Sequence, residues 1–534
     1  MKKRRSSLLW VHIALCILVV ITYLNGFTND FTSDDISLFT NSNALGNWSF
    51  VTTQGVYFLQ PLIYVIVYKI FGAVAIWYRL ITVLLHIVSV EMIFMIVSCI
   101  LSPVAAVFAA SLFAVHPLLV ESVTWISGGP YAWSTSFFLL SLYWYIHFRS
   151  SNKKSIYIFS IIAYFLSLSV GLTATALAAA FLLYEFCFGN IKKNWKELIP
   201  YFALAILYAL VALSALNNRI DSFQGKLAWE IPQYSLLNIP FIVSKYIELY
   251  ILPIKLSHYQ VDVLGNPLRL VVFAMFVAGI IYSYLKNKYI FFGLSFFLIS
   301  LLPTLVPIGV HWLVAERYVY AGLFGMAFVT GWFFYYCSLR QGFRTATYIV
   351  FAAYILLLQI RTIMRNDDWK NELNLWKATV QTSPADAKGH NNLANAYISQ
   401  GKYRDALGEL KIAIQLKPDY SDAYLNIGLA YDKIGNMEEA DRYYRLALTY
   451  NPQEWQAYHN IGLLYNKKKQ YMIASDYIKK AIKINPQYAL LHTDLGVMYY
   501  FAGKKQEAQQ AFLQALALDP TSQMATLGYQ ESLK

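Results

Sequence analysis

Proline recurs at a fixed interval in the C-terminal part of the chain, and this recurrence constrains the fold more than any other feature. The interval is 34 residues, and the positions are Pro384, Pro418, Pro452, Pro486 and Pro520. Tyrosines keep the same register at Tyr397, Tyr431, Tyr465 and Tyr499. A period of this length accommodates one pair of antiparallel helices, and such pairs stack because a single pair cannot bury its apolar face. The sequence therefore predicts a stacked helical array.

The period and the spacing of small residues are those of the tetratricopeptide repeat. We expect a repeat domain over residues 384–534, with four full repeats and a capping helix at about 521–533. A half-repeat over residues 366–383 is expected to link it to the preceding domain. The first helices of the repeats are expected to end at Gly401, Gly435 and Gly503, with Lys469 as the exception in the third repeat.

A ladder of amide side chains follows the same period and consists of Asn392, Asn426, Asn460 and Asp494. On the first helix of each repeat these residues would line the concave groove, which is a binding surface in such arrays. Asparagine can both donate to and accept from the backbone of an extended peptide. The ladder therefore favours a groove for a protein or peptide acceptor. The alternative is that these residues only satisfy local helix contacts.

The preceding residues, 1–365, form a succession of apolar runs. Hydrophobic residues make up 57% of the chain and charged residues 14%, against about 25% charged in soluble proteins. This composition excludes a single soluble enzyme and indicates an all-α, polytopic membrane bundle. About 17–25 residues cross a bilayer core. The eleven candidate spans are roughly 8–25, 76–98, 103–115, 131–148, 156–170, 172–188, 199–216, 268–285, 289–309, 319–337 and 346–360.

Basic clusters orient this bundle. Before Pro384 the chain has 26 Lys and Arg against 15 Asp and Glu, and the excess lies in short loops, as the positive-inside rule describes. It is not the basic stripe of a nucleic-acid-binding protein. All the clusters share the cytoplasmic side only if stretches 57–71 and 240–253 do not cross. We therefore expect these two to be interfacial or re-entrant helices, the N-terminus to be cytoplasmic and the repeats to be extracytoplasmic.

The N-terminus and the cysteines bear on localisation. The basic residues Lys2–Arg5 precede an apolar run without a small-residue cleavage site, so we expect a retained anchor. The four cysteines lie in or beside apolar runs, which excludes a disulfide framework and a CxxC metal site. The short basic N-terminus and the absence of a retention tetrapeptide favour a bacterial inner membrane. The endoplasmic reticulum membrane is the alternative.

The first outer loop carries two adjacent carboxylates, Asp34 and Asp35. A carboxylate at the membrane surface can act as a general base toward an acceptor hydroxyl. The alternative is an ordinary solvated loop.

Several segments together resemble one family. They are Phe31–Asp35, Leu84–His86, Phe113–Gly128 and Ala315–Tyr320, followed by the repeats. In their order, spacing and topology they are similar to the transmembrane and tetratricopeptide-repeat protein O-mannosyltransferases of the GT-C glycosyltransferase superfamily. The resemblance implies a GT-C-type membrane fold, a polyprenyl-phosphate-linked sugar donor, mannose as the sugar and protein Ser/Thr acceptors. It places the catalytic base at Asp34, with Asp35 beside it.

The implied reaction inverts the anomeric carbon while Asp34 takes the hydroxyl proton. The leaving polyprenyl phosphate needs a cation, and Arg317 is the best candidate because its planar fork suits phosphate oxygens. The alternative is that Arg317 pairs with its neighbour Glu316. Other residues expected to contact the donor or support the site are Tyr318, His116 and Glu121. His116 and Glu121 have an alternative role in capping the helix that begins at Pro117. For His86 and Glu91, within a span, we favour hydrogen bonding between helices.

This chain departs from the family pattern at three places, where Gln60-Pro61-Leu62, Gly129-Pro130-Tyr131 and Gly171–Thr175 stand in place of charged residues. A catalytically inactive membrane scaffold, whose repeats assemble protein partners, is therefore the second hypothesis. A transporter is disfavoured because no inverted hydropathy repeat is apparent. No cofactor follows from the sequence, and the role of a divalent metal is left open.

Overall fold

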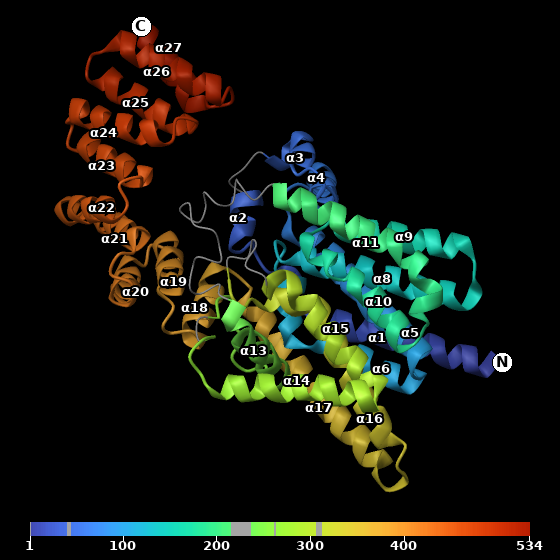
Figure 1. Ribbon diagram of the computed structural model, residues 1–534. Coiled ribbons are helices and arrows are strands. Elements are labelled where there is room, and N and C mark those ends of the chain that lie inside the picture. Colours follow the sequence, from blue (N-terminus) through green and yellow to red (C-terminus); the bar gives the residue numbers. More distant parts are fainter. Residues whose placement is uncertain (1, 40–43, 215–235, 261–262, 306–311) are drawn as a thin grey trace. The chain divides into compact units, whose positions relative to one another are not determined.

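The computed structural model describes residues 2–39, 44–214, 236–260, 263–305 and 312–534, and every regular element in these ranges is a helix. The ends of two expected spans (215–216 and 306–309) and parts of the expected outer loops (40–43, 217–235, 261–262 and 310–311) lie outside the described residues. The chain forms two compact units, Met1–Ser383 and Pro384–Lys534. We call them the membrane unit and the repeat unit and describe each by itself (Figure 1).

Six helices within the described ranges are long and apolar enough to cross a membrane. They lie in α1 (Lys2–Tyr23), α5 (Ala75–Ile100), α14 (Leu268–Lys286), α15 (Lys288–Leu305), α16 (Tyr320–Ser338) and α17 (Arg344–Asp368). A seventh span results if α6 (Pro103–Val115) is counted together with Pro117–Val123, which turns away by 53°. The turn falls where Pro117 forces an extended backbone on His116. The protein is therefore an integral membrane protein, and the count of about eleven spans stays a prediction.

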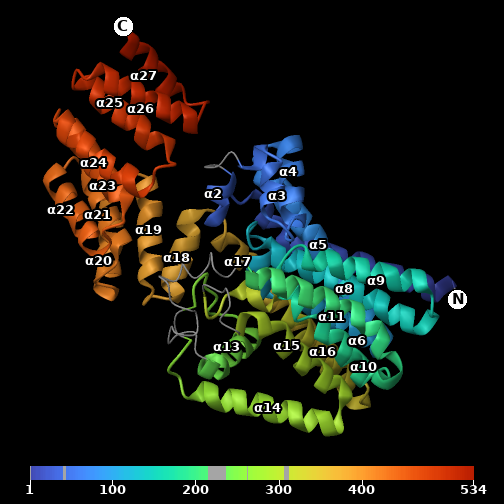
Figure 2. The same ribbon diagram turned by 45° about the horizontal axis from the view of Figure 1, so that its top comes forward.

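The remaining helices of the membrane unit are shorter or more polar. Most follow the expected runs: α8 (Gly129–Ser151), α9 (Lys154–Leu168), α10 (Ala178–Cys187) and α11 (Ile191–Ser214). Helices α8, α9 and α11 lie side by side in both views (Figures 1 and 2). The run expected at 172–188 starts as a 3-10 turn, η4 (Leu172–Thr175), before α10. Helices α4 (Leu59–Phe71) and α13 (Ile239–Ile251) have 13 residues each, about 20 Å of helix, which is too short for a ~30 Å bilayer core.

Close packing in the membrane unit depends on small residues. Gly293 of α15 and Gly325 of α16 face each other, and a Cβ added at Gly293 would lie 2.6 Å from the Gly325 carbonyl oxygen. Small residues at such a contact allow two helix backbones to approach closely inside a bilayer. Short elements complete this unit: η1 (Leu24–Thr28), α2 (Asp34–Phe39), η2 (Ala44–Gly46), α3 (Ser49–Thr53), η3 (Pro117–Leu119), α7 (Val120–Val123), η8 (Leu236–Asn238), η9 (Glu316–Val319), η10 (Gln341–Phe343) and α18 (Glu372–Thr382).

The repeat unit confirms the predicted tetratricopeptide array. Its helices are α19 (Ala387–Ser399), α20 (Tyr403–Leu416), α21 (Ser421–Ile434), α22 (Met437–Tyr450), α23 (Trp455–Lys467), α24 (Tyr471–Ile484), α25 (Ala489–Phe501), α26 (Lys505–Leu518) and α27 (Gln523–Leu533). Each first helix packs on its own second helix, and each pair packs on the next (Figure 2). Within two residues of the end of each first helix the backbone becomes left-handed, with φ between 59° and 93° at Gly401, Gly435, Lys469 and Gly503.

Candidate active site

The two adjacent carboxylates of the first loop have different surroundings. Asp34 is exposed, whereas Asp35 is fully buried. One oxygen of Asp35 accepts hydrogen bonds from the backbone N–H of Ser127 at 2.8 Å and from its hydroxyl at 2.5 Å. The other oxygen is buried without a hydrogen-bond partner among the described residues. Burial raises the pKa of Asp35 to about 6. Asp34 is thus the carboxylate that can meet a substrate, and Asp35 fastens the loop.

The backbone of this acidic loop, residues 29–35, is held from several sides. The guanidinium of Arg79 donates to the carbonyls of Asn29, Asp30 and Thr124. The Trp125 indole N–H donates to the Thr32 carbonyl at 3.1 Å. The loop therefore sits on α5 and on the turn after α7. Arg79 is almost completely buried, so its bonds to carbonyl oxygens replace the hydration that the cation loses.

Arg317 lies next to the acidic loop through Trp125. Its guanidinium carbon is 5.3 Å from the centre of the Trp125 ring and 5.0 Å from that of Tyr318. The Arg317 guanidinium also forms an ion pair with the buried Glu121, and its backbone N–H donates to the other Glu121 oxygen at 2.8 Å. The expected alternative, a pair between Glu316 and Arg317, is wrong because both side chains have other partners.

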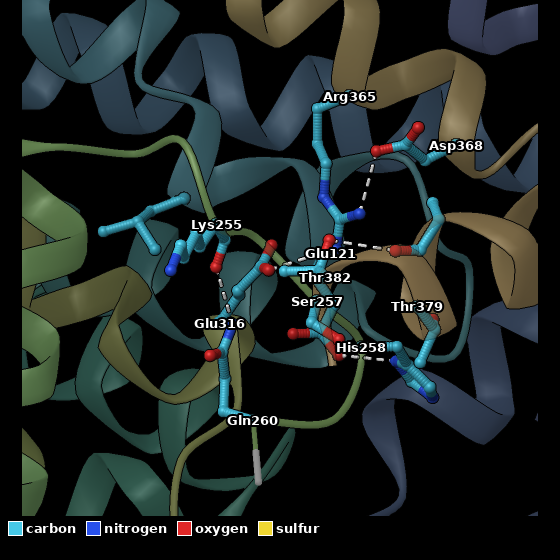
Figure 3. A network of polar contacts seen from close by, with 12 residues as sticks. Glu121, Lys255, Ser257, His258, Gln260, Glu316, Arg365, Asp368, Thr379 and Thr382 are labelled. Carbon is cyan, nitrogen blue, oxygen red and sulfur yellow. Dashed lines mark hydrogen bonds and ion pairs between the residues drawn. The ribbon is translucent and has the colours of Figure 1, made fainter. Parts of the chain in front are cut away.

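Glu316 instead pairs with a residue from the end of α17. Its carboxylate is 3.0 Å from Nη2 of Arg365, and both side chains are fully buried. Nη1 of Arg365 is 2.9 Å from Asp368. Figure 3 shows this network together with Glu121 and His258. The result is a buried set of paired charges where α17, η9 and α7 meet.

His258 completes the network from the loop after α13. Its Nδ1 is 3.1 Å from Glu121, and its ring makes edge contacts with Trp125 and Trp369. Burial among these groups lowers the pKa of His258 below its usual value. The neighbouring Ser257 and Tyr259 carbonyl accept hydrogen bonds from Ser383. The segment Lys255–Gln260 therefore fastens the network to the end of the membrane unit.

The histidines expected near the site have local partners. His116 Nδ1 accepts the backbone N–H of Leu118, which caps the turn beginning at Pro117, and Nε2 lies 3.1 Å from the Tyr250 carbonyl. His86 Nδ1 lies 2.6 Å from the Tyr320 hydroxyl, and Glu91 pairs with His12 of α1. These contacts have the geometry of helix capping, the alternative given for His116, and of hydrogen bonding between helices, the role favoured for His86 and Glu91.

The ladder residues of the repeat unit are partly exposed, and two of them contact the adjoining repeat. The Asn426 amide donates to Asn391 at 2.9 Å. Asp494 lies 2.7 Å from His459, the residue before Asn460. Each contact joins a ladder residue to the residue that immediately precedes the ladder residue of the previous repeat. The ladder therefore also links successive repeats, and this use engages one donor of Asn426.

Arg79, which holds the acidic loop, was not predicted from the sequence, and neither were His258, Arg365 and Asp368 of the buried network. Arg79 could have been selected from the sequence, because a cation near the start of a predicted span is unusual and is often functional. His258 and Arg365 carry no motif, and their partners are 137 and 49 residues away. Within the described ranges, no group of three or more His, Cys, Asp or Glu residues is arranged to hold a metal ion.

Comparison with family models supports the repeat unit. Tetratricopeptide repeat models match residues 421–454, 456–488 and 489–522, and a TPR repeat model matches 394–435. A tetratricopeptide repeat protein of Thermus thermophilus, known from its crystal structure, is 22% identical with a TM-score of 0.28 and covers 33% of this chain and 95% of its own.

Curated relatives extend beyond the repeats. Protein O-mannosyl-transferase F38B6.6 of Caenorhabditis elegans is 26% identical over 324 residues, which are 56% of this chain and 44% of that protein. Human protein O-mannosyl-transferase TMTC3 is 23% identical over 382 residues, 62% of this chain and 41% of that protein. The chain thus spans less than half the length of these relatives. The predicted resemblance is confirmed, and this membrane protein with a C-terminal tetratricopeptide array is similar to the TMTC protein O-mannosyl-transferases.

Proposed function

We propose that this membrane protein transfers a sugar, mannose by its resemblance, from a polyprenyl-phosphate donor to Ser or Thr hydroxyls of a protein. The observation that carries the proposal is the exposed Asp34 carboxylate on a loop that is fixed beside Arg317 through Trp125. A general base must reach the substrate and must also be held in a defined position. Asp34 and its loop meet both requirements.

In the proposed reaction Asp34 acts on the acceptor hydroxyl and Arg317 on the donor phosphate. Asp34 accepts the hydroxyl proton while the hydroxyl oxygen bonds to the anomeric carbon from the face opposite the phosphate. The bond between that carbon and the phosphate oxygen breaks, the configuration inverts, and polyprenyl phosphate leaves. Arg317 stabilises the phosphate through the N–H groups that Glu121 does not use, and its side chain remains 12% exposed. Glu316, Tyr318 and Glu121 keep Arg317 and its turn in place.

The repeat unit then binds the acceptor. Asn392, Asn426, Asn460 and Asp494 are spaced along successive first helices, which suits hydrogen bonding along an extended peptide. The donor's lipid tail stays in the bilayer, so a groove for the polymeric acceptor complements a site at the membrane surface. By the distribution of basic residues, this site and the repeats are extracytoplasmic and the N-terminus is cytoplasmic.

Replacement of the base tests the proposal. Purified protein is supplied with polyprenyl-phosphate-linked mannose and a Ser/Thr-rich peptide, and transfer is followed for the parent, Asp34→Asn and Asp30→Asn. Asp30 is an exposed carboxylate of the same loop, so it is the matched control. We expect Asp34→Asn to lower kcat by about 10²–10⁴-fold and Asp30→Asn to behave like the parent. Equal transfer by the parent and Asp34→Asn contradicts the assignment of the base.

A second candidate is a non-catalytic scaffold whose repeats assemble partners. It is favoured by the charged family positions that this chain replaces and by the pairing of Arg317 with Glu121. No transfer by the parent with any of several lipid-linked sugars, together with peptide binding by the repeats, would support the scaffold.

A further inference from the structure

The acidic loop is attached to the stretch that joins α17 to α18, far along the chain. The Asn29 amide donates to the Asn366 carbonyl and the Asp30 backbone N–H to the Lys370 carbonyl, each at 2.9 Å. The backbone N–H of Ser33 donates to Oε1 of Glu372. Only the last of these bonds uses a charged side chain, and it involves the residue immediately before Asp34.

Ser33 has an unusual backbone. Its φ is 55°, in the left-handed region that side chains other than glycine rarely adopt. A residue persists in this conformation only when its surroundings hold it there. The bond to the Glu372 carboxylate is charge-assisted and stronger than one to a neutral acceptor. It is therefore one contact that holds Ser33 in this conformation, and the turn at Ser33 immediately precedes Asp34, where α2 begins.

Glu372 is itself held in place by neighbouring residues, so it can fix the position of Ser33. It is the first residue of α18, after the N-cap Asn371, whose side chain accepts the backbone N–H of Asn374 at 3.0 Å. Its second oxygen accepts the indole N–H of Trp376 at 2.8 Å. Trp376 is nearly buried against His258 and Tyr259. One carboxylate thus joins a rigid aromatic cluster to the loop that carries the base.

We propose that Glu372 is a positioning residue for Asp34: it holds Ser33 in the left-handed conformation and so directs the base at the acceptor hydroxyl. This inference rests on the proposed function. Without the carboxylate, Ser33 relaxes to an ordinary negative φ and Asp34 turns away. Misplacing a catalytic group by about 1 Å can cost about 10²-fold in rate. Binding of donor and acceptor does not involve Glu372, so the loss falls on kcat.

The first test does not require the protein to transfer a sugar. Hydrogen exchange of a peptide covering residues 29–36 is measured in detergent-solubilised parent, Glu372→Ala, Glu372→Gln and Trp376→Phe. We expect faster exchange in Glu372→Ala, and exchange close to that of the parent in Glu372→Gln, because the amide oxygen still accepts the Ser33 N–H. Trp376→Phe removes the second bond of Glu372 together with part of the packing on His258 and Tyr259, so it controls for loosening of α18. Unchanged exchange in Glu372→Ala, or equal acceleration in Trp376→Phe, overturns the positioning role.

The second test measures transfer on the same samples, corrected for the folded fraction. Glu372→Ala should lower kcat by at least about tenfold with both KM values within about twofold, and Glu372→Gln should recover most of the rate. If Glu372→Ala lowers the amount of folded protein but leaves kcat unchanged, the proposal is overturned, because Glu372 then contributes to stability and not to the position of Asp34. If the parent shows no transfer, the proposed function fails. The exchange result then decides separately whether Glu372 holds the loop.

Discussion

Arg317 and Glu121 are 196 residues apart in the chain, yet they form a buried ion pair in which Glu121 also accepts the backbone N–H of Arg317. The Glu121 carboxylate therefore fixes both the side chain and the backbone of the residue assigned to the donor phosphate. His258 is its remaining partner. A substitution at Arg317 consequently acts on stability as well as on donor use.

Arg317→Ala should lower both stability and donor use, because it leaves the buried Glu121 with His258 as its ion-pair partner among the described residues. Breaking a buried pair by removing one partner costs about 3–5 kcal/mol, which a fall in Tm in detergent would report. Arg317→Lys should keep more stability and more donor use, since it retains the charge but loses the fork. Donor kinetics for Arg317→Ala that match the parent would remove Arg317 from the site.

Asp35 should make stability depend on pH. Its pKa is about 6 in the folded protein, against 3.8 for an unperturbed side chain. Between these values the folded state holds a proton that the unfolded state has lost, so the free energy of unfolding falls as pH rises from about 4 to about 6. The fall is about 3 kcal/mol. Asp35→Asn does not titrate, so its Tm relative to the parent should rise over this window. A constant difference in Tm would contradict the prediction.

The asparagine ladder should act on acceptor binding and not on the chemical step. Replacing Asn392, Asn426 and Asn460 together by Ala should raise the apparent KM for a long acceptor and leave kcat unchanged, because uniform binding energy is lost. A short peptide that cannot reach both the groove and Asp34 should be little affected. Asn391→Ala is the control, since it removes the partner of Asn426 but keeps the ladder. Equal loss with the short peptide would mean that the repeats support the catalytic fold.

Replacing Lys469 by glycine should stabilise the protein. Lys469 has φ 59° where the other three repeats have glycine, and a left-handed backbone costs about 1–2 kcal/mol in other residues. Lys469→Gly should therefore raise the free energy of unfolding by up to about 1 kcal/mol, less the extra entropy of glycine in the unfolded chain. The neighbouring Lys468 has φ −78°, so Lys468→Gly should not stabilise. Urea unfolding distinguishes the two variants, and the reverse order would refute the explanation.

Sidedness can be tested with single cysteines in a cysteine-free background. A cysteine at Lys153, which is exposed between α8 and α9, should resist an impermeant thiol reagent in intact cells. One at Ala385, exposed before α19, should react once any outer membrane is permeabilised. The same response at both positions would refute the charge-based topology.

Local and periodic features were predictable from the sequence. The 34-residue period placed the repeats because every contact that defines a repeat lies within it or in the next one. The first helices end beside Gly401, Gly435 and Gly503 as expected, and Lys469, which takes the place of glycine in the third repeat, has the same left-handed backbone. The apolar runs predicted most helices of the membrane unit to within a few residues. They could not show that α17 continues to Asp368, because charged and polar residues interrupt the apolar run after Gln359.

Long-range pairings were not predictable. Glu316 and Arg317 are adjacent in the sequence, and this adjacency suggested an ion pair between them. Helix packing instead brings Arg365 to the Glu316 carboxylate, and these two residues form the pair. The difference between Asp34 and Asp35 likewise depends on Ser127, 92 residues further along the chain. Such contacts follow from how the helices pack, which the apolar pattern of any one helix does not specify.

The bond between Ser33 and Glu372 has a consequence for biosynthesis. The two residues are separated by 339 positions, so the acidic loop leaves the ribosome long before its partners exist. At about 5–20 residues per second, the interval is roughly 20–70 s. During this time every span between them must be inserted while Asp34 lacks its support. The first loop to be translated thus gains this bond only after the last candidate span has been made, and a chain released before Glu372 would lack the contact that we propose positions Asp34.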